Sequence, residues 1–244
     1  MNIKLIDVCK EYNGKEVLNI DELNFKEGYV YALLGLNGSG KTTLLQCVSG
    51  LEDFTRGTVL YDNKAFGEFV KRDISVMLQS PYLFNSSVIE NIIMGLKFRK
   101  FSKKAIEERI SLYRSCFEID DLLNKNSREL SGGEQAKVSL LRTAILETKM
   151  TFLDEPTASM DIESTLRAEK LIESMAKGKR SVILVTHDLM QAERVADFII
   201  FLDKGRIIEQ GEKHKVLNFP EHKLLRQLLK RSDDNDKNCN IDHE

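Results

Sequence analysis

The chain has 244 residues, of which 42% are hydrophobic and 30% charged, so it can form one large folded domain or a domain with a substantial insert. Its 36 Lys and Arg residues nearly balance its 38 Asp and Glu residues, which argues against non-specific nucleic-acid binding, and we predict no nucleic-acid partner. The longest apolar runs are strand-sized, and residues 1–10 contain no signal-peptide apolar block. We therefore expect a cytoplasmic protein that meets any membrane through a partner.

The first third of the chain is predicted to form strands, a glycine-rich loop and one helix. Strands are expected at residues 3–8 and 17–20. Residues 29–34 are a continuous apolar run, typical of a strand buried on both faces, and lead directly into the glycine-rich residues 35–42. The apolar stripe of the following helix is expected at Leu44, Leu45, Val48 and Leu51.

The middle of the chain has a helical pattern, and the part after it alternates strands with a helix. Between residues 86 and 146 the apolar side chains recur at helical spacing, as at Ile106, Ile110, Tyr113 and Phe117. Two buried strands are then expected, followed by two strands that flank the hairpin turn at residues 203–205. The four predicted strands are 150–153, 181–186, 198–202 and 206–209, and the first two are joined by a helix over 162–175.

These segments predict an α/β core with a helical insert. The core is assigned to residues 1–85 and 147–215, and the insert to residues 86–146. A C-terminal helix is expected at residues 216–231. Residues 232–244 are polar and mostly acidic, with almost no apolar side chain to bury, so we expect a disordered acidic tail.

Residues 35–42, GLNGSGKT, match the phosphate-binding pattern GxxxxGK[ST]. Glycines allow several backbone N–H groups to converge on a phosphate chain, and the following helix adds its positive N-terminal end. Lys41 can then reach the terminal phosphates, and the hydroxyl of Thr42 can ligate Mg²⁺. A glycine-rich turn without chemical meaning is the alternative, which the strand before the loop and the helix after it disfavour.

The strand at 150–153 ends in two carboxylates, Asp154 and Glu155. Ligands of parallel sheets bind beyond the carboxyl ends of the strands, so Asp154 is expected near a Mg²⁺ held by Thr42. Glu155 can then orient or deprotonate a water molecule. On its own this pattern is weak, because a strand often runs into a solvated acidic loop, and its value comes from the phosphate loop.

Residues 130–134, LSGGE, combine a helix start with two glycines. Ser131 and Glu134 have the spacing of a capping box. Gly132 and Gly133 each cost about 1 kcal/mol of helix stability relative to alanine. A helix start that accepts this cost is expected to keep its backbone N–H groups open to an anion.

With these motifs in order, the sequence resembles the ABC ATPases, the nucleotide-binding subunits of ABC transporters, over nearly all of residues 1–215. Residues 35–42 resemble the Walker A loop of that family, residues 150–155 its Walker B strand and residues 130–134 its signature motif. Gln79 resembles the Q-loop glutamine, which touches Mg²⁺ and communicates with the membrane subunit. Residues 158–161 resemble the D-loop, with Met160 where the family often has leucine.

The resemblance also assigns roles to individual residues. His187 matches the switch histidine, and Tyr12 stands where the family places an aromatic ring against adenine. The implied catalytic residues are Glu155, His187, Lys41 and Gln79. The implied ATP-binding residues are Tyr12, Asn37, Gly38, Ser39, Gly40, Lys41, Thr42, Thr43, Ser131, Gly132 and Gly133. The implied Mg²⁺ ligands are Thr42, Gln79 and Asp154.

The fold implied by the resemblance is α/β: a P-loop NTPase core with an N-terminal antiparallel β subdomain and an inserted α-helical subdomain. The implied activity is ATP hydrolysis coupled to transport, in a head-to-tail dimer with a second copy or a paralogous cassette. Permease subunits would hold the dimer on the cytoplasmic face of the membrane, together with a solute-binding protein. Residues 82–84 can belong to the core or to the permease interface, and the residues alone leave both open.

Residues 188–197 and 205–211 are similar to importer cassettes for small solutes. Residues 219–225 favour the group that imports amino acids and oxyanions, and we lean toward an oxyanion such as tungstate, molybdate or phosphate. A soluble ABC ATPase of Fe–S assembly and an exporter cassette are the alternatives. A P-loop kinase or GTPase would leave residues 130–134 and His187 unexplained.

Overall fold

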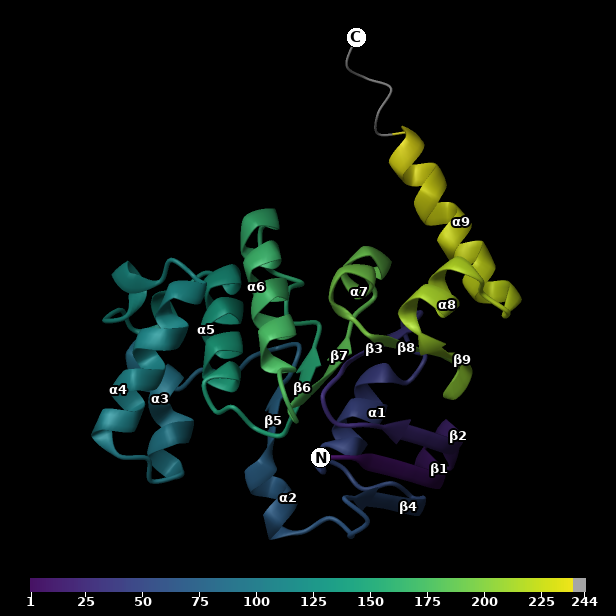
Figure 1. Ribbon diagram of the computed structural model, residues 1–244, viewed down its shortest axis with the longest axis horizontal. Helices are drawn as coiled ribbons and strands as arrows, with labels where there is room; N and C mark the ends of the chain where they lie inside the picture. The colour runs from purple at the N-terminus through teal and green to yellow at the C-terminus, as the bar shows by residue number, and fades with distance from the viewer. Residues whose placement is uncertain (239–244) are drawn as a thin grey trace.

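The computed structural model describes residues 1–238, which form two sheets with helices around them (Figure 1). The larger sheet has six strands in the order β5-β6-β7-β3-β8-β9, all parallel except the edge strand β9. These strands are β5 (Ile74–Met77), β6 (Met150–Asp154), β7 (Ser181–Val185), β3 (Val30–Gly35), β8 (Phe198–Asp203) and β9 (Arg206–Glu212). The smaller, antiparallel sheet has the order β2 (Lys15–Phe25), β1 (Ile3–Tyr12) and β4 (Arg56–Tyr61). The predicted α/β fold with an N-terminal antiparallel sheet is confirmed.

The central strands of the parallel sheet are buried along their whole length. Every residue of β3, β6 and β7 is buried, as their continuous apolar runs predict for strands covered on both faces. The hairpin β8–β9 also forms as predicted, with an antiparallel register around residues 203–205.

Helix α1 (Lys41–Val48) packs between the two sheets. Its buried Leu44, Leu45 and Val48 share one hydrophobic core with residues of β1, β2, β3, β6, β7 and β8. Leu51, predicted on the same stripe, is instead 53% exposed. The N–H of Leu51 bonds to the carbonyl of Gln46 at 2.9 Å, which closes the helix in a C-terminal turn and carries the side chain off the stripe.

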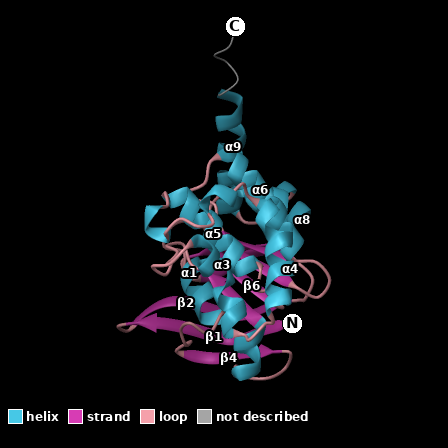
Figure 2. Cartoon of the chain, turned by 90° about the vertical axis from the view of Figure 1, so that its left-hand side faces the viewer, coloured by secondary structure: helices cyan, strands magenta, loops and turns pink. Residues whose placement is uncertain are grey.

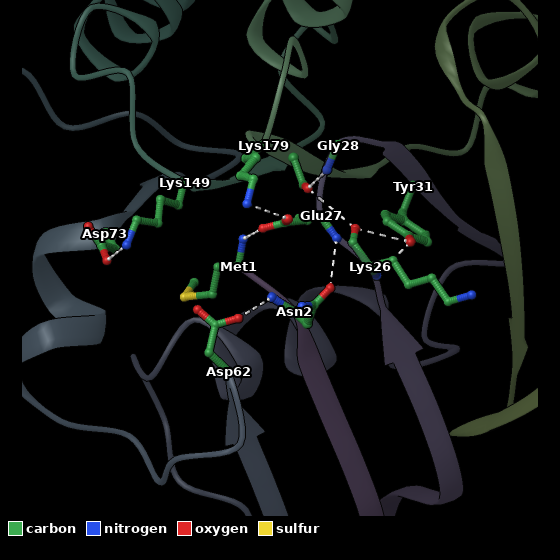
Figure 3. A network of polar contacts seen from close by, with 11 residues as sticks. Met1, Asn2, Lys26, Glu27, Gly28, Tyr31, Asp62, Asp73, Lys149 and Lys179 are labelled. Atoms are coloured by element: carbon green, nitrogen blue, oxygen red, sulfur yellow. Dashed lines mark hydrogen bonds and ion pairs between the residues drawn. The ribbon is translucent and has the colours of Figure 1, made fainter.

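Figure 3 shows polar contacts that attach the antiparallel sheet to the rest of the core. The side-chain oxygen of Asn2 accepts the N–H of Glu27 at 3.0 Å, and the hydroxyl of Ser181 on β7 accepts the N–H of Gly28 at 2.8 Å. Lys149, just before β6, pairs with Asp73 at 2.7 Å. The first two contacts connect the start of β1 and the segment after β2 to β7, and the Lys149–Asp73 pair joins the segments that precede β6 and β5.

The segment predicted as a helical insert contains α3 (Val88–Phe98), α4 (Lys103–Tyr113) and α5 (Gly132–Ala144). Its apolar side chains join one core with α6 (Ile162–Met175) and with Met77, Leu153, Val182 and Leu184 of the parallel sheet. Figure 2 shows helices stacked above the antiparallel sheet. The 3₁₀ turns Arg114–Cys116, Asp120–Leu122 and Ser127–Glu129 complete this segment. The short helix α2 (Glu68–Asp73) lies outside it, directly before β5.

The C-terminal part differs from the predicted single helix over 216–231. Helix α8 (Lys213–Asn218) follows α7 (Leu189–Val195) and the hairpin, and then breaks before Pro220, whose ring cannot continue a helix. Helix α9 (Lys223–Asn238) packs its leucines, including Leu225, against a core of β3, α7 and β8. It runs into the segment predicted to be disordered, because propagation of a formed helix adds one bond per residue. Residues 239–244 of that segment lie outside the described residues.

Candidate active site

The site lies where four neighbouring strands end at one edge of the parallel sheet. Strands β5, β6, β7 and β3 are adjacent and run parallel. They lead to Gln79, to Asp154 and Glu155, to His187 and to residues 35–42, respectively. The carboxyl ends of parallel strands are where this kind of sheet binds ligands. Segments as far apart in the chain as Gly35 and His187 therefore converge at this edge.

The glycine-rich loop makes backbone approaches that a side chain would block. Gly35 has a φ of +150°, and a Cβ placed there would lie 2.2 Å from the carbonyl oxygen of Leu202. Helix α1 begins after Gly40 with no side-chain cap and no acidic residue in its first turn. Its first N–H groups and its positive end are thus left to an anion.

Two polar groups of this loop are suited to a bound phosphate chain. The ammonium of Lys41 donates to the carbonyl oxygens of Gly35 at 2.8 Å and Leu36 at 3.1 Å, and burial lowers its pKa against the opposing effect of Glu155 and Asp154. Among the described residues, the buried hydroxyl of Ser39 has no hydrogen-bond partner. An orphaned hydroxyl in a cradle of N–H groups fits an oxygen-rich ligand.

The loop forms one wall of a cavity of about 420 Å³. Its lining contains the predicted loop residues together with Gln79, Asp154 and Glu155, and also Val17 and Val185, which the sequence did not single out for this role. The predicted loop residues in the lining are Asn37, Gly38, Ser39, Gly40, Lys41, Thr42 and Thr43.

Thr42 and Asp154 lie side by side, as predicted for a shared Mg²⁺. The hydroxyl of Thr42 donates to Oδ1 of Asp154 at 3.3 Å, and burial raises the pKa of Asp154 while this bond opposes the rise. Within the described residues no group of three or more His, Cys, Asp or Glu side chains could hold a metal by itself. The pair therefore suits Mg²⁺, which takes one or two protein oxygens and completes its shell with phosphate and water.

Glu155 and His187 face each other across the ends of β6 and β7. Nδ1 of His187 lies 2.9 Å from Oε1 and 3.0 Å from Oε2 of Glu155. Glu155 has a φ of +48°, uncommon for a residue other than glycine, and its N–H bonds to the carbonyl of Val185 at 2.9 Å. Such a conformation persists only where its surroundings hold it, and it is found most often at functional sites.

The start of α5 has the predicted capping box, but it lines a different cavity from that of the phosphate loop. Ser131 and Glu134 form a complete capping box, with N–H to oxygen distances of 2.7 Å and 3.3 Å. Gly132 lines a cavity of about 260 Å³ with Gln79, Glu155 and Ser159. A Cβ on Gly133 would lie 2.8 Å from the carbonyl oxygen of Ser159. Glycine at this position therefore also has a packing reason that the sequence did not reveal.

Tyr12 lies at the end of β1, 40% exposed, and is not part of the lining of the phosphate-loop cavity. Its hydroxyl donates to Glu52, which raises the pKa of Tyr12 to about 12, and Lys10 lies 4.8 Å from its ring centre. In this structure the ring thus has local partners of its own.

Residues 82–84 were predicted to lie either in the core or at the permease interface, and the structure has one of them in the core and two exposed. Leu83 packs against the core, whereas Tyr82 is 74% and Phe84 44% exposed. Asn91 of α3, fully buried, holds this segment by accepting the N–H of Phe84 at 2.8 Å and donating to its carbonyl at 2.9 Å. Sequence reasoning missed Asn91, although an amide within the apolar stripe of a predicted helix is a usable signal.

The fold and the loop geometry define a P-loop protein with a site for a nucleoside triphosphate. The chain belongs to the ABC transporter family: residues 18–158 match that family. It is 37% identical to the tungstate uptake system ATP-binding protein TupC of Peptoclostridium acidaminophilum, over 86% of this chain and 98% of the relative. It is 30% identical to the phosphate import ATP-binding protein PstB 2 of Aliivibrio fischeri, over 93% and 89%.

A solved structure shares both the fold and part of the sequence. The dimeric ATP-binding cassette MJ0796, in a post-hydrolysis state with ADP and phosphate, is 26% identical with a TM-score of 0.78, over 86% of this chain and 98% of that one. The chain is thus an ATP-hydrolysing ABC subunit, as its motifs predicted.

Proposed function

We propose that the chain is the ATPase of an importer for a small solute and works as a dimer with two composite ATP sites. The observation that carries the proposal is the convergence of the phosphate loop, the Thr42–Asp154 pair and the Glu155–His187 pair at one sheet edge. The names of its relatives favour import over export and over the Fe–S assembly alternative.

Each residue has a role that follows from its position. Lys41 and the N–H groups of residues 37–43 bind the phosphates, and Thr42, Asp154 and Gln79 hold Mg²⁺, which supplies positive charge to the phosphate oxygens. Glu155 orients and deprotonates the attacking water, because Glu155 lines the phosphate cavity and its backbone is held by the bond from its N–H to the carbonyl of Val185. His187, 2.9 Å from that carboxylate, fixes its orientation.

Two copies are required because the α5 start lies apart from the phosphate loop. Ser131, Gly132 and Gly133 are not part of the lining of the cavity that contains Lys41. In a head-to-tail dimer, the α5 start of one copy would close on the ATP of its partner. The dimeric state of the solved relative supports this arrangement.

Among residues 1–238, no helix is both long and apolar enough for a bilayer crossing. We assign attachment to the membrane to permease subunits, because the relatives are named as ATP-binding proteins of uptake and import systems. We place the contact at a groove of about 360 Å³ whose exposed aromatic side chains Tyr82, Phe84 and Phe98 suit the apolar face of a permease helix. A solute-binding protein completes the importer, and the two relatives favour an oxyanion as its solute, ahead of an amino acid.

The mechanism is tested with a Glu155→Gln variant, which keeps the shape of the side chain but cannot accept a proton. We expect its phosphate release to fall at least about 100-fold, and we expect Mg-ATP to convert it to a dimer on size-exclusion chromatography. Glu163→Gln, at an exposed carboxylate of α6, is the matched control. Wild-type turnover by Glu155→Gln would exclude Glu155 as the base.

The transport assignment is tested by a pull-down of the tagged chain from detergent-solubilised host membranes. Recovery of a permease and a solute-binding protein would support an importer, and the purified binding protein can then be titrated with tungstate, molybdate and phosphate. Recovery of Fe–S assembly proteins without a permease would keep the ATPase and overturn transport.

A further inference from the structure

Helix α7 begins directly after His187 and is fastened to its surroundings at both ends. Asp188 caps it, accepting the N–H groups of Met190 at 2.8 Å and Gln191 at 3.1 Å. At the far end, Arg194 makes a bidentate pair with Glu169 of α6, with both N to O distances 2.7 Å. His187 thus lies between the end of β7 and the anchored start of α7.

Between these two attachments, Gln191 makes a contact that leaves the helix. Its side-chain amide donates to the hydroxyl of Thr157 at 2.8 Å. Thr157 is two residues after Glu155, in the turn that follows β6. The residues on either side of His187 are likewise tied, since the N–H of Asp188 bonds to the hydroxyl of Thr186 at 3.1 Å. The Gln191–Thr157 bond thus joins the segment of His187 to the segment of Glu155.

The environment of Gln191 is unusual for a residue whose role is only to pack in the core. The side chain is 1% exposed, and among the described residues its amide oxygen is buried without a hydrogen-bond partner. Burying half of an amide unsatisfied is unfavourable, so an apolar side chain of the same size would suit stability better. A group retained against stability is expected where function requires it.

The backbone conformation of Glu155 requires contacts on both sides to hold it. Its left-handed backbone, at a φ of +48°, is held on one side by the N–H bond to Val185. The turn on its other side contains Thr157, whose side chain is attached to α7 through Gln191. Loss of that attachment frees the turn to relax and to move the Glu155 carboxylate relative to His187.

We propose that Gln191 is a positioning residue for ATP hydrolysis. Through its bond to Thr157, it keeps the Glu155 carboxylate at a fixed position relative to His187. The proposal rests on the proposed roles of Glu155 and His187. It predicts an effect on turnover without an effect on nucleotide binding, because neither Gln191 nor Thr157 is part of the lining of the phosphate-loop cavity.

The test measures steady-state Mg-ATPase and thermal unfolding of the full chain. Gln191→Met keeps the length of the side chain and removes both polar atoms. Thr157→Val keeps the shape and removes the hydroxyl. Each is expected to lower kcat about tenfold, with KM for ATP unchanged within about twofold. The Tm of Gln191→Met should equal or exceed that of the wild type. Thr157→Ser, which keeps the hydroxyl, should retain most of the wild-type kcat.

A double variant shows whether the two substitutions lower kcat through the loss of one shared bond or through two independent effects. If the two side chains act through their shared bond, Gln191→Met with Thr157→Val loses no more than either single variant. Glu193→Ala, at an exposed position on α7, is the control and should leave kcat unchanged. If Gln191→Met does not fold, the comparison of kcat between Thr157→Val and Thr157→Ser still tests whether the Thr157 hydroxyl is needed for turnover.

Three results would overturn the proposal: wild-type kcat in Gln191→Met, additive losses in the double variant, or a fall in Tm with a parallel rise in KM. These results require an active wild-type chain. If the wild-type chain itself has no Mg-ATPase activity, the proposed function fails instead, so the two failures are distinguishable.

Discussion

Two helices of this chain begin at glycine-rich segments, and their first turns are built in opposite ways. Helix α1 has Gly40 before it and no side-chain cap, whereas α5 has a complete capping box from Ser131 and Glu134. Around the α1 start, the hydroxyl of Ser39 has no hydrogen-bond partner within residues 1–238, and burial raises the pKa of Asp154. At the α5 start, the backbone N–H of Ser131 bonds to Glu134 and lowers the pKa of that carboxyl.

This difference matches the two proposed roles. The α1 start binds its ligand within one chain, so its groups can remain uncompensated until ATP arrives. The α5 start has to wait for a second copy, and until then it must be stable by itself. Unsatisfied polar groups at a binding site cost stability that ligand binding recovers. Substitutions in these two regions test the difference.

The largest effect is expected from Lys41→Met, which removes the ammonium at the α1 start. Hydrogen bonds to charged groups contribute about 1.5–3 kcal/mol, so ATP affinity of the monomer should fall about 10–100-fold. Nucleotide titration by calorimetry measures this. Lys103→Met, at the exposed start of α4, is the control. Unchanged affinity would mean that Lys41 does not contact the phosphates.

The two glycines of α5 should respond differently to alanine. A Cβ on Gly133 would lie 2.8 Å from the carbonyl oxygen of Ser159, so Gly133→Ala should destabilise the fold by about 1–3 kcal/mol. On Gly132 the nearest atom is 3.9 Å away, and alanine there should be neutral or stabilise by up to about 1 kcal/mol. Urea unfolding compares the pair. Equal changes in the free energy of unfolding would show that the close approach of Gly133 to Ser159 does not affect stability.

Ser131→Ala removes the α5 cap and should cost about 1 kcal/mol. The matched variant is Ser102→Ala, because Ser102 caps α4 through the N–H of Ala105 at 3.2 Å. Both should lower stability similarly and leave ATP affinity of the monomer unchanged. Only Ser131→Ala should also weaken the ATP-dependent dimer, measured by light scattering in the Glu155→Gln background. A loss of monomer affinity would instead place Ser131 in the ATP site of its own chain.

The smallest stability change is expected from Asp154→Asn, and it should be an increase. A carboxyl whose pKa is raised on folding favours the folded state at low pH, and this contribution is lost as the pH rises through the raised pKa. At neutral pH the buried charge of Asp154 is therefore unfavourable, and asparagine should stabilise by roughly 0.5–1 kcal/mol while removing Mg²⁺-dependent turnover.

The pH dependence should have the opposite sign at the α5 start. The pKa of Glu134 is lowered, so its contribution is present above the unfolded pKa and is lost as the pH falls through the lowered value. Urea unfolding of Asp154→Asn and Glu134→Gln between pH 4 and pH 8 tests both signs. Relative to the wild type, Asp154→Asn should lose more stability on acidification and Glu134→Gln should lose less. A pH dependence equal to that of the wild type in both variants would contradict both signs.

The local elements could be predicted because their signals are local. The apolar runs at 29–34, 150–153 and 181–186 correspond to β3, β6 and β7, and the helical period over 162–175 corresponds to α6. The phosphate loop was predictable because its glycines, lysine and threonine act through positions a few residues apart. The end of α1 and the break between α8 and α9 were not predicted, since single-residue effects decide such boundaries.

The sequence alone therefore determined the class of protein, the phosphate loop, the carboxylates after β6 and the capping box of α5. Which side chains contact one another between neighbouring strands and helices depends on the tertiary structure. It placed His187 2.9 Å from Glu155, brought Ser159 against Gly133 and joined Gln191 to Thr157. These contacts connect residues that no periodicity relates, because they depend on how strands and helices far apart in the chain pack side by side.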